Sequence, residues 1–182
     1  AIDGTKIADD AINSEHYTDG SIDTQHIADD QVTGAKLANS ITIADALTVT
    51  GSTSIAEAIE KVTVESGTSG TINYDVLTQA VSFFNVDQAA NRTINFRGDG
   101  STTLNATMGN GESMSFAILM KQGGSAYYLN AYQIDGSSVT PEWSGGTAPS
   151  AGNANSIDVY TFTIIKTASA TYTVLAAQSK FA

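Results

Sequence analysis

Residues 2 to 41 read IDGTKIADDA, INSEHYTDGS, IDTQHIADDQ and VTGAKLANSI, four units of ten residues that begin at Ile2, Ile12, Ile22 and Val32. The sixth position of each unit is apolar as well, so a large apolar side chain returns every five residues. Polar residues lie between them, with Asp-Gly and Asp-Asp pairs of the kind found in turns. The stretch is therefore a repeat with an apolar period of five.

A period of five fits neither a helix nor a strand. On a helix, five residues end about 140° past the starting face, and on a strand an odd step places successive side chains on opposite faces. Each group of five must therefore contain a bend. One such chain has too few apolar residues to bury against itself, and repeats of this kind are buried by their neighbours. The neighbours are either stacked coils of the same chain or parallel copies around a shared axis, and the small number of units favours parallel copies.

Composition and charge exclude several classes of protein. The 182 residues carry a net charge of −11; residues 1 to 66 hold twelve acidic and three basic side chains, and the remainder holds seven and five. Nucleic acid binding depends on clustered Lys and Arg, so we expect none. The absence of cysteine excludes disulfides and thiolate metal sites. Apolar runs are too short for a membrane span, so we expect no membrane insertion.

Residues 54 to 62 carry the pattern of a short helix. A capping box is followed by apolar residues at the spacing of one helix face; the residues are Ser54 and Glu57, then Ile55, Ile59 and Val62. A helix of about ten residues is marginal alone in water. Its narrow apolar stripe suits a short parallel three-helix bundle. We therefore predict a helical clamp between the repeat and the rest of the chain.

From Thr71 onward, apolar and polar residues alternate in runs that are separated by Gly, Asn and Asp, which is typical of strands and turns. Eight such runs predict an antiparallel β-sandwich that is jelly-roll-like. The longest loop signal is residues 144 to 156. The predicted strands span residues 71–77, 79–86, 92–97, 102–107, 112–122, 126–134, 157–166 and 170–178.

Two regions resemble a known family. The pattern Ile-Asp-x-x-His-Ile-Ala-Asp-Asp, closing in VTGAKLA at residues 32 to 38, resembles the shaft repeats of bacteriophage tail-fibre proteins. Residues 70 to 182, with the segments NYDVLTQAVSFF, TINFRGDG, VTPEWSGG and IDVYTFTIIKTASATYTVLAAQSKFA, resemble the C-terminal domains of virion structural and tail-fibre proteins of marine cyanobacterial phages. The resemblance implies a trimeric fibre with a distal β-rich domain that binds the host surface. It carries over no catalytic or binding residue.

These patterns together predict a mainly β protein, a homotrimeric fibre with three parts. Residues 1–50 form an irregular decapeptide-repeat shaft, residues 51–70 a short coiled-coil helix and linker, and residues 71–182 the β-sandwich head. The apolar side chains of the repeat and of the helix face the shared axis. The predicted axis residues are Ile2, Ile7, Ile12, Tyr17, Ile22, Ile27, Val32, Leu37, Ile55, Ile59 and Val62.

Trp143, the only tryptophan, is the centre of a candidate saccharide site. It follows Glu142, and Asp135 and Tyr132 lie shortly before it. An aromatic face beside carboxylates can stack on a sugar ring and accept hydrogen bonds from its hydroxyls. The alternative is that Trp143 fills the core of the sandwich or a subunit contact, where large aromatic side chains are common.

Metal binding and catalysis have little support. His16 and His26 would form rings of three imidazoles in a trimer, but lysine occupies the same column in the other two units, which favours a solvated role. The acidic cluster of the repeat suits turns better than Ca²⁺; it consists of Asp9, Asp10, Asp19, Asp29 and Asp30. Motifs of nucleophilic, metal-dependent or phosphate-binding enzymes are missing. We therefore expect no cofactor, no metal and no enzymatic activity.

The sequence thus predicts a structural component of a phage virion, a homotrimeric fibre whose C-terminal domain is exposed for attachment to host-surface saccharide. The expected partners are further copies of the chain, other tail or capsid proteins of the virion, and host polysaccharide. Two alternatives stay open. One is a polysaccharide depolymerase that uses Asp135 and Glu142 as an acid and base pair. The other is a purely architectural decoration or linker protein of the virion.

Overall fold

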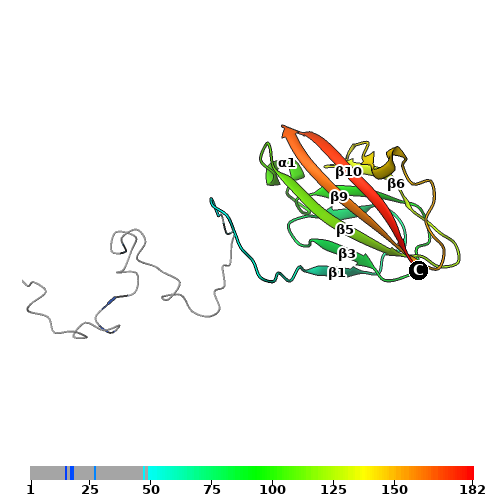
Figure 1. Ribbon diagram of the computed structural model, residues 1–182, viewed down its shortest axis with the longest axis horizontal. Coiled ribbons are helices and arrows are strands. Elements are labelled where there is room, and N and C mark those ends of the chain that lie inside the picture. Colours follow the sequence, from blue (N-terminus) through cyan, green and yellow to red (C-terminus); the bar gives the residue numbers. More distant parts are fainter. Residues whose placement is uncertain (1–14, 16, 19–26, 28–46, 48) are drawn as a thin grey trace, which may run out of the picture. The chain divides into compact units, whose positions relative to one another are not determined.

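The computed structural model describes residues 15, 17, 18, 27, 47 and 49–182. The chain divides into two units, Ala1–Ile55 and Ala56–Ala182, and the second holds the regular secondary structure described below (Figure 1). Its elements are β1 (Val62–Glu65), β2 (Ile72–Asp75), β3 (Val81–Phe84), β4 (Arg92–Arg97), α1 (Leu104–Thr107), β5 (Ser113–Lys121), β6 (Leu129–Ile134), β7 (Ser137–Ser138), β8 (Glu142–Trp143), the 3₁₀ turn η3 (Ser144–Gly146), β9 (Ile157–Ala168) and β10 (Thr171–Phe181).

The strands form two sheets between which the chain alternates. The six-stranded sheet has the order β1-β3-β5-β9-β10-β8, and the four-stranded sheet has the order β2-β4-β6-β7. Strands β1, β3 and β5 are parallel neighbours in one sheet, and β2, β4 and β6 are parallel neighbours in the other. Parallel neighbours need a crossover connection, and here each crossover contains a strand of the opposite sheet. The first six strands therefore wind as a two-layered coil.

A long antiparallel hairpin completes the six-stranded sheet. β9 pairs with β5 over its first nine residues, and β10 returns along β9 to Phe181 (Figure 1). The short strand β8 then pairs in parallel with β10 and forms the last edge of the sheet. Strand β1, which follows the N-terminal unit in the chain, forms the opposite edge.

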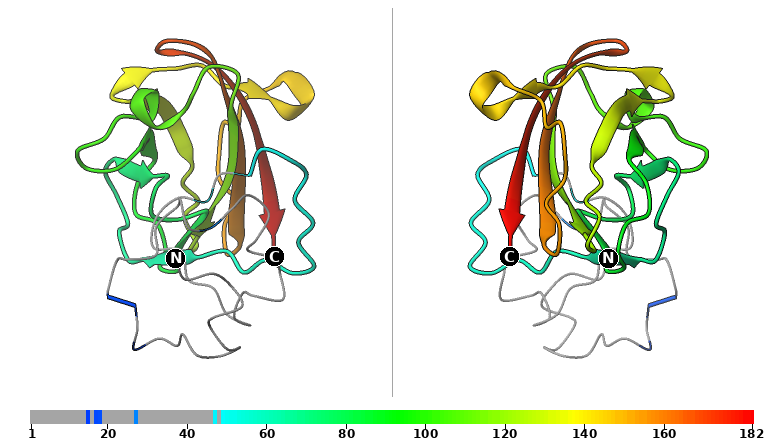
Figure 2. Two further views of the ribbon diagram at one scale, coloured as in Figure 1. Left: turned by 90° about the vertical axis from the view of Figure 1, so that its left-hand side faces the viewer. Right: turned by 90° about the vertical axis from the view of Figure 1, so that its right-hand side faces the viewer.

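Aromatic side chains from the two sheets meet in the core. Tyr74 and Phe96 come from the four-stranded sheet, and Phe116 and Phe162 come from the six-stranded sheet. The ring centroids of Phe96 lie 5.0 Å from those of both Phe116 and Phe162, and Tyr74 stacks on Phe116 at 4.9 Å. Figure 2 shows the two layers that enclose this cluster, with β6 in yellow-green opposite the orange and red hairpin.

The prediction of a mainly β head is confirmed, but the antiparallel pairing is wrong. Five of the eight strand pairs in the described part of the chain are parallel. Apolar alternation specifies that a segment is a strand and which of its faces is buried. It carries no information on the direction of the neighbouring strand, so the two-layered coil was not visible in the pattern.

Seven of the eight predicted strands coincide with observed strands, namely β2, β3, β4, β5, β6, β9 and β10. The eighth, at residues 102–107, is wrong, because Leu104–Thr107 forms the helical turn α1. The Thr103 hydroxyl caps it by accepting a hydrogen bond from the Ala106 amide at 3.1 Å. Leu104 is fully buried and anchors the turn to the core.

The predicted helical clamp is also wrong. Residues 51–61 contain no helix, and Val62 opens strand β1, where it pairs with Val81. Ile55 and Ile59 are 66% and 95% exposed. A helix of about ten residues is unstable without packing of its apolar face, and these two side chains have little packing in the described chain. The six-stranded sheet therefore begins inside the segment predicted as helix and linker.

Several predictions fall on the N-terminal unit. Of the predicted axis residues there, Tyr17, Ile27 and Ile55 are described, and all three are exposed in the single chain. The others lie outside the described residues, as do His16, His26 and the acidic cluster of the repeat; the axis residues concerned are Ile2, Ile7, Ile12, Ile22, Val32 and Leu37. Within the described part of the chain, no helix has the length and apolarity needed to cross a membrane.

The core contact between the sheets predicts the effect of a truncation. Phe96→Ala removes a fully buried ring that touches Tyr74, Phe116 and Phe162. We expect the free energy of unfolding in urea to fall by about 3 to 5 kcal/mol, because the substitution leaves a cavity. The control Gln133→Ala, on the outer face of the four-stranded sheet, should change it by less than about 0.5 kcal/mol. Equal losses for both variants would contradict this account of the core.

Candidate functional site

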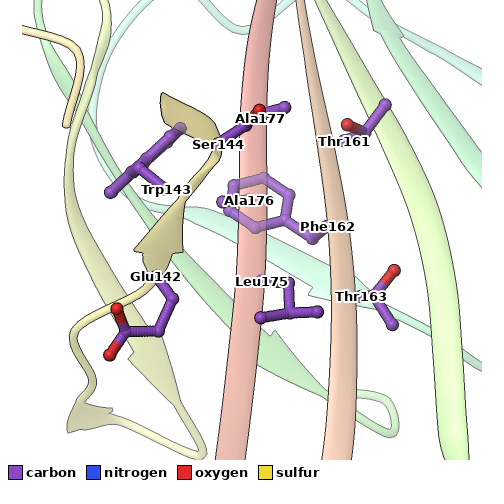
Figure 3. A pocket seen from close by; sticks show the side chains of 9 residues that line it. All are labelled: Glu142, Trp143, Ser144, Thr161, Phe162, Thr163, Leu175, Ala176 and Ala177. Carbon is purple, nitrogen blue, oxygen red and sulfur yellow. The ribbon is translucent and has the colours of Figure 1, made fainter. Parts of the chain in front are cut away.

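The candidate site lies at the β8 edge of the six-stranded sheet. Glu142 and Trp143 pair in parallel register with Leu175 and Ala176 of β10. Beside them is a surface pocket with a volume of about 400 Å³. Figure 3 shows Glu142 and Trp143 on one side of β10, and Thr161 and Thr163 of β9 on its other side. The pocket is lined by Glu142, Trp143, Ser144, Thr161, Phe162, Thr163, Leu175, Ala176 and Ala177.

Alternation along β10 decides where the two β8 side chains point. Ala176 is buried and Leu175 is exposed, so Trp143 shares the core side of the sheet and Glu142 shares the outer side. The Trp143 ring meets the edges of Tyr132 and Phe162, at centroid distances of 5.5 Å and 6.4 Å. Trp143 is partly buried and joins the two sheets at this edge. Trp143 therefore fills part of the core, which is one of the two roles that the sequence left open.

Trp143 is nevertheless also a surface residue. It borders the pocket beside β10 and a second pocket of about 320 Å³ on the side of Pro141 and Val139. Tyr132 lines this second pocket. Trp143 therefore lines both pockets.

Tyr132 is held in place by the protein. Its hydroxyl donates a hydrogen bond to the carbonyl oxygen of Leu129. Burial, with a smaller contribution from Tyr128, raises the pKa of Tyr132 well above its usual range. Its hydroxyl is therefore a neutral group committed to the backbone, and its ring supports Trp143.

Asp135 has a structural role apart from the pocket beside β10. Its carboxylate accepts hydrogen bonds from the backbone amides of Leu104 at 2.7 Å and Asn105 at 3.1 Å. These are amides at the first turn of α1, where a helix leaves its donors unpaired. Asp135 lines a different pocket, together with Arg97 and Asp99. The structure therefore places Trp143 with Glu142 in one pocket and with Tyr132 in another, and it places Asp135 in neither.

Sequence reasoning missed the contribution of the hairpin. Thr161 and Thr163 of β9 line the pocket beside β10, with Leu175 and Ala177 on the neighbouring strand. The Thr163 hydroxyl is within hydrogen-bond distance of Ser115, at 2.8 Å. The signal was present, since these residues occupy the polar positions in the alternating pattern of β9. Only the register with β8 shows that they lie near Trp143.

The pocket beside β10 has a mixed aromatic and polar lining. It offers an indole, one carboxylate and several hydroxyls, which suit a neutral polyhydroxylated ligand. Acid and base hydrolysis of a glycoside needs two carboxylates at fixed separation, and Glu142 is the only carboxylate that lines this pocket. Among the described residues, no group of three or more His, Asp or Glu side chains is arranged to hold a metal ion.

Comparison of the chain with protein-family models, with curated proteins and with solved structures finds no match.

Truncation of Asp135 and truncation of Glu142 should have different effects on the stability of the protein. Asp135→Ala removes both hydrogen bonds to α1 and puts alanine at a backbone φ of +50°, so we expect the free energy of unfolding to fall by about 1 to 3 kcal/mol. Glu142→Ala removes an exposed side chain and should cost less than about 0.5 kcal/mol. Urea titrations of the two variants provide the measurement. A stable Asp135→Ala protein would show that α1 is not held by this carboxylate.

Proposed function

We propose that this chain is a structural component of a bacteriophage virion, a homotrimeric fibre whose C-terminal β domain is exposed for attachment to saccharides of the host surface. Its partners in this role are two further copies of itself, neighbouring tail or capsid proteins of the virion, and host polysaccharide. The protein acts by binding and spacing, without catalysis.

The observation that carries the proposal is the five-residue apolar period of residues 2 to 41. It requires a bend in each group of five and leaves too little apolar surface for one chain to bury alone. Three parallel copies around an axis supply the missing neighbours. The resemblance of the repeat to tail-fibre shafts and of residues 70 to 182 to cyanophage virion proteins supports the same assignment.

Saccharide attachment is assigned to the pocket beside β10. Glu142 lies on the outer side of the sheet, Trp143 borders the pocket and Thr161 adds a hydroxyl. An aromatic surface with polar neighbours can bury the apolar face of a sugar and pair its hydroxyls. Three heads on one fibre would multiply a weak contact, because linked sites bind with a raised effective concentration.

Light scattering of the full chain tests the assembly. We expect a mass of three times 18.9 kDa, because the repeat buries its apolar residues only between copies. A single-chain mass that persists at high protein concentration would refute the trimeric fibre and return the repeat to a coil of one chain.

Intrinsic fluorescence tests the saccharide site, because Trp143 is the only tryptophan. Titration with surface polysaccharide purified from a marine cyanobacterium should shift its emission. Glu142→Ala should weaken this binding by about tenfold, the loss of about 1.4 kcal/mol typical of a significant contact.

The matched control is Asp87→Ala, which removes another exposed carboxylate from a different pocket and should leave binding unchanged. Release of reducing ends during the titration would instead favour a depolymerase. No spectral change with any host polysaccharide would favour a purely architectural role for the head.

A further inference from the structure

The outer faces of the two sheets differ in chemistry. Most outward positions of the four-stranded sheet are polar, and two pairs of their side chains contact one another. Asn95 donates a hydrogen bond to Asn73 at 3.0 Å, and Arg97 forms an ion pair with Asp75. This is what a sheet face in contact with water requires. The outer face of the six-stranded sheet is different.

Two rows of side chains cross the outer face of the six-stranded sheet. Residues next to them in the chain, such as Phe84, Ile118 and Tyr160, are buried in the core, so alternation turns the rows outward. The strand register aligns Val62, Val81 and Ala117 in one row. The second row aligns Val64, Phe83, Leu119 and Val159. We call these seven residues the apolar outer patch.

The patch is exposed where its strands reach the edge. Val64 on β1 is 60% exposed, whereas the side chains on the inner strands β3, β5 and β9 are partly exposed. None of the seven residues carries a charge, and no described element of the second unit is a layer over this face (Figure 2). A contiguous apolar face on a folded domain marks an interaction surface.

The position of the patch in the chain identifies its occupant. β1 is the edge strand that follows the N-terminal unit in the chain, and Ile59, three positions before β1, is also exposed. In the proposed fibre, copies are joined along their repeats, and β1 follows the repeat at the same distance along each chain. A second copy therefore has a higher effective concentration near the patch than any other protein. Residues 67 to 182 hold seven acidic and five basic side chains, and none of the seven patch residues is charged, so copies of the head can approach through this face with little repulsion.

We propose that the apolar outer patch packs against a second copy of this chain and is the surface that joins the head domains. This inference rests on the proposed fibre and names the face through which its heads associate. The heads are then held together by burial of Phe83, Leu119 and their neighbours, independently of the repeat.

Cysteine labelling of the full chain tests the inference, because the native sequence contains no cysteine. Leu119→Cys lies in the patch, and Gln133→Cys has the same exposure class on the outer face of the other sheet. In the assembled protein, a maleimide should modify Leu119→Cys at least about tenfold more slowly than Gln133→Cys, since reaction requires opening of the contact. The difference should vanish in urea.

A second pair of variants tests the same contact by weakening it at the edge strand β1. Val64→Asp and Asn73→Asp each place a carboxylate at an outward position of an edge strand, one in the patch and one on the polar face. In the full chain that carries Leu119→Cys, we expect Val64→Asp to raise the rate of maleimide modification at least about tenfold, because it opens the contact, and Asn73→Asp to leave that rate unchanged.

The outcomes separate this inference from the proposed function. A trimeric parent in which Leu119→Cys and Gln133→Cys react equally fast, with no change on Val64→Asp, would overturn the patch contact and leave the fibre intact. A monomeric parent would overturn both. A monomer in which Leu119→Cys is still protected would show that residues of the same chain cover the patch, and the second copy would be the wrong occupant.

Discussion

The contact between the aromatic side chains of the two sheets is what the head domain depends on. Neither sheet can bury an apolar face alone, and Phe96 on one sheet meets both Phe116 and Phe162 on the other. Such ring contacts add to the transfer free energy of the buried surface. Because the chain alternates between the sheets from β1 to β6, every turn of the coil adds a strand to each side of this cluster. Removal of the cluster would separate the layers rather than loosen one strand.

Buried polar groups fix the connections around that core. Asp158 is fully buried and accepts hydrogen bonds from the backbone and side chain of Asn153, which ties the long loop to β9. The Lys166 ammonium donates to the carbonyl oxygen of Asn105 within α1 and to that of Met108 directly after it. Burial lowers the pKa of Arg92, whose guanidinium lies over Phe84 and donates to Gly67. A buried charge is costly unless it is paired or hydrogen-bonded, so each of these loops is held to one path.

The sequence predicted the elements of the head better than their arrangement. Alternation in residues such as Phe116, Ile118 and Met120 located the strands and their buried faces correctly, because this information is local. Pairing direction depends on residues distant in the chain and was predicted wrongly. The turn α1 depends on Asp135, about thirty positions later, whose carboxylate caps it. The sequence grouped Asp135 with Trp143 because the two residues are close in the chain. In the structure Asp135 lines a different pocket and contacts α1, since a carboxylate near a tryptophan in sequence need not face it in the fold.

The order of the six-stranded sheet separates the two surfaces that the proposed fibre uses. β1 and β8 are its opposite edges, so the apolar outer patch lies mainly on β1, β3 and β5, and the pocket lies beside β10 near the other edge. β9 alone contributes to both, through Val159 in the patch and Thr161 and Thr163 in the pocket. A head joined to its copies near β1 therefore leaves Trp143 at the free edge. Because Val159 and Thr161 are both on β9, contacts between heads at the patch would also position the pocket beside β10.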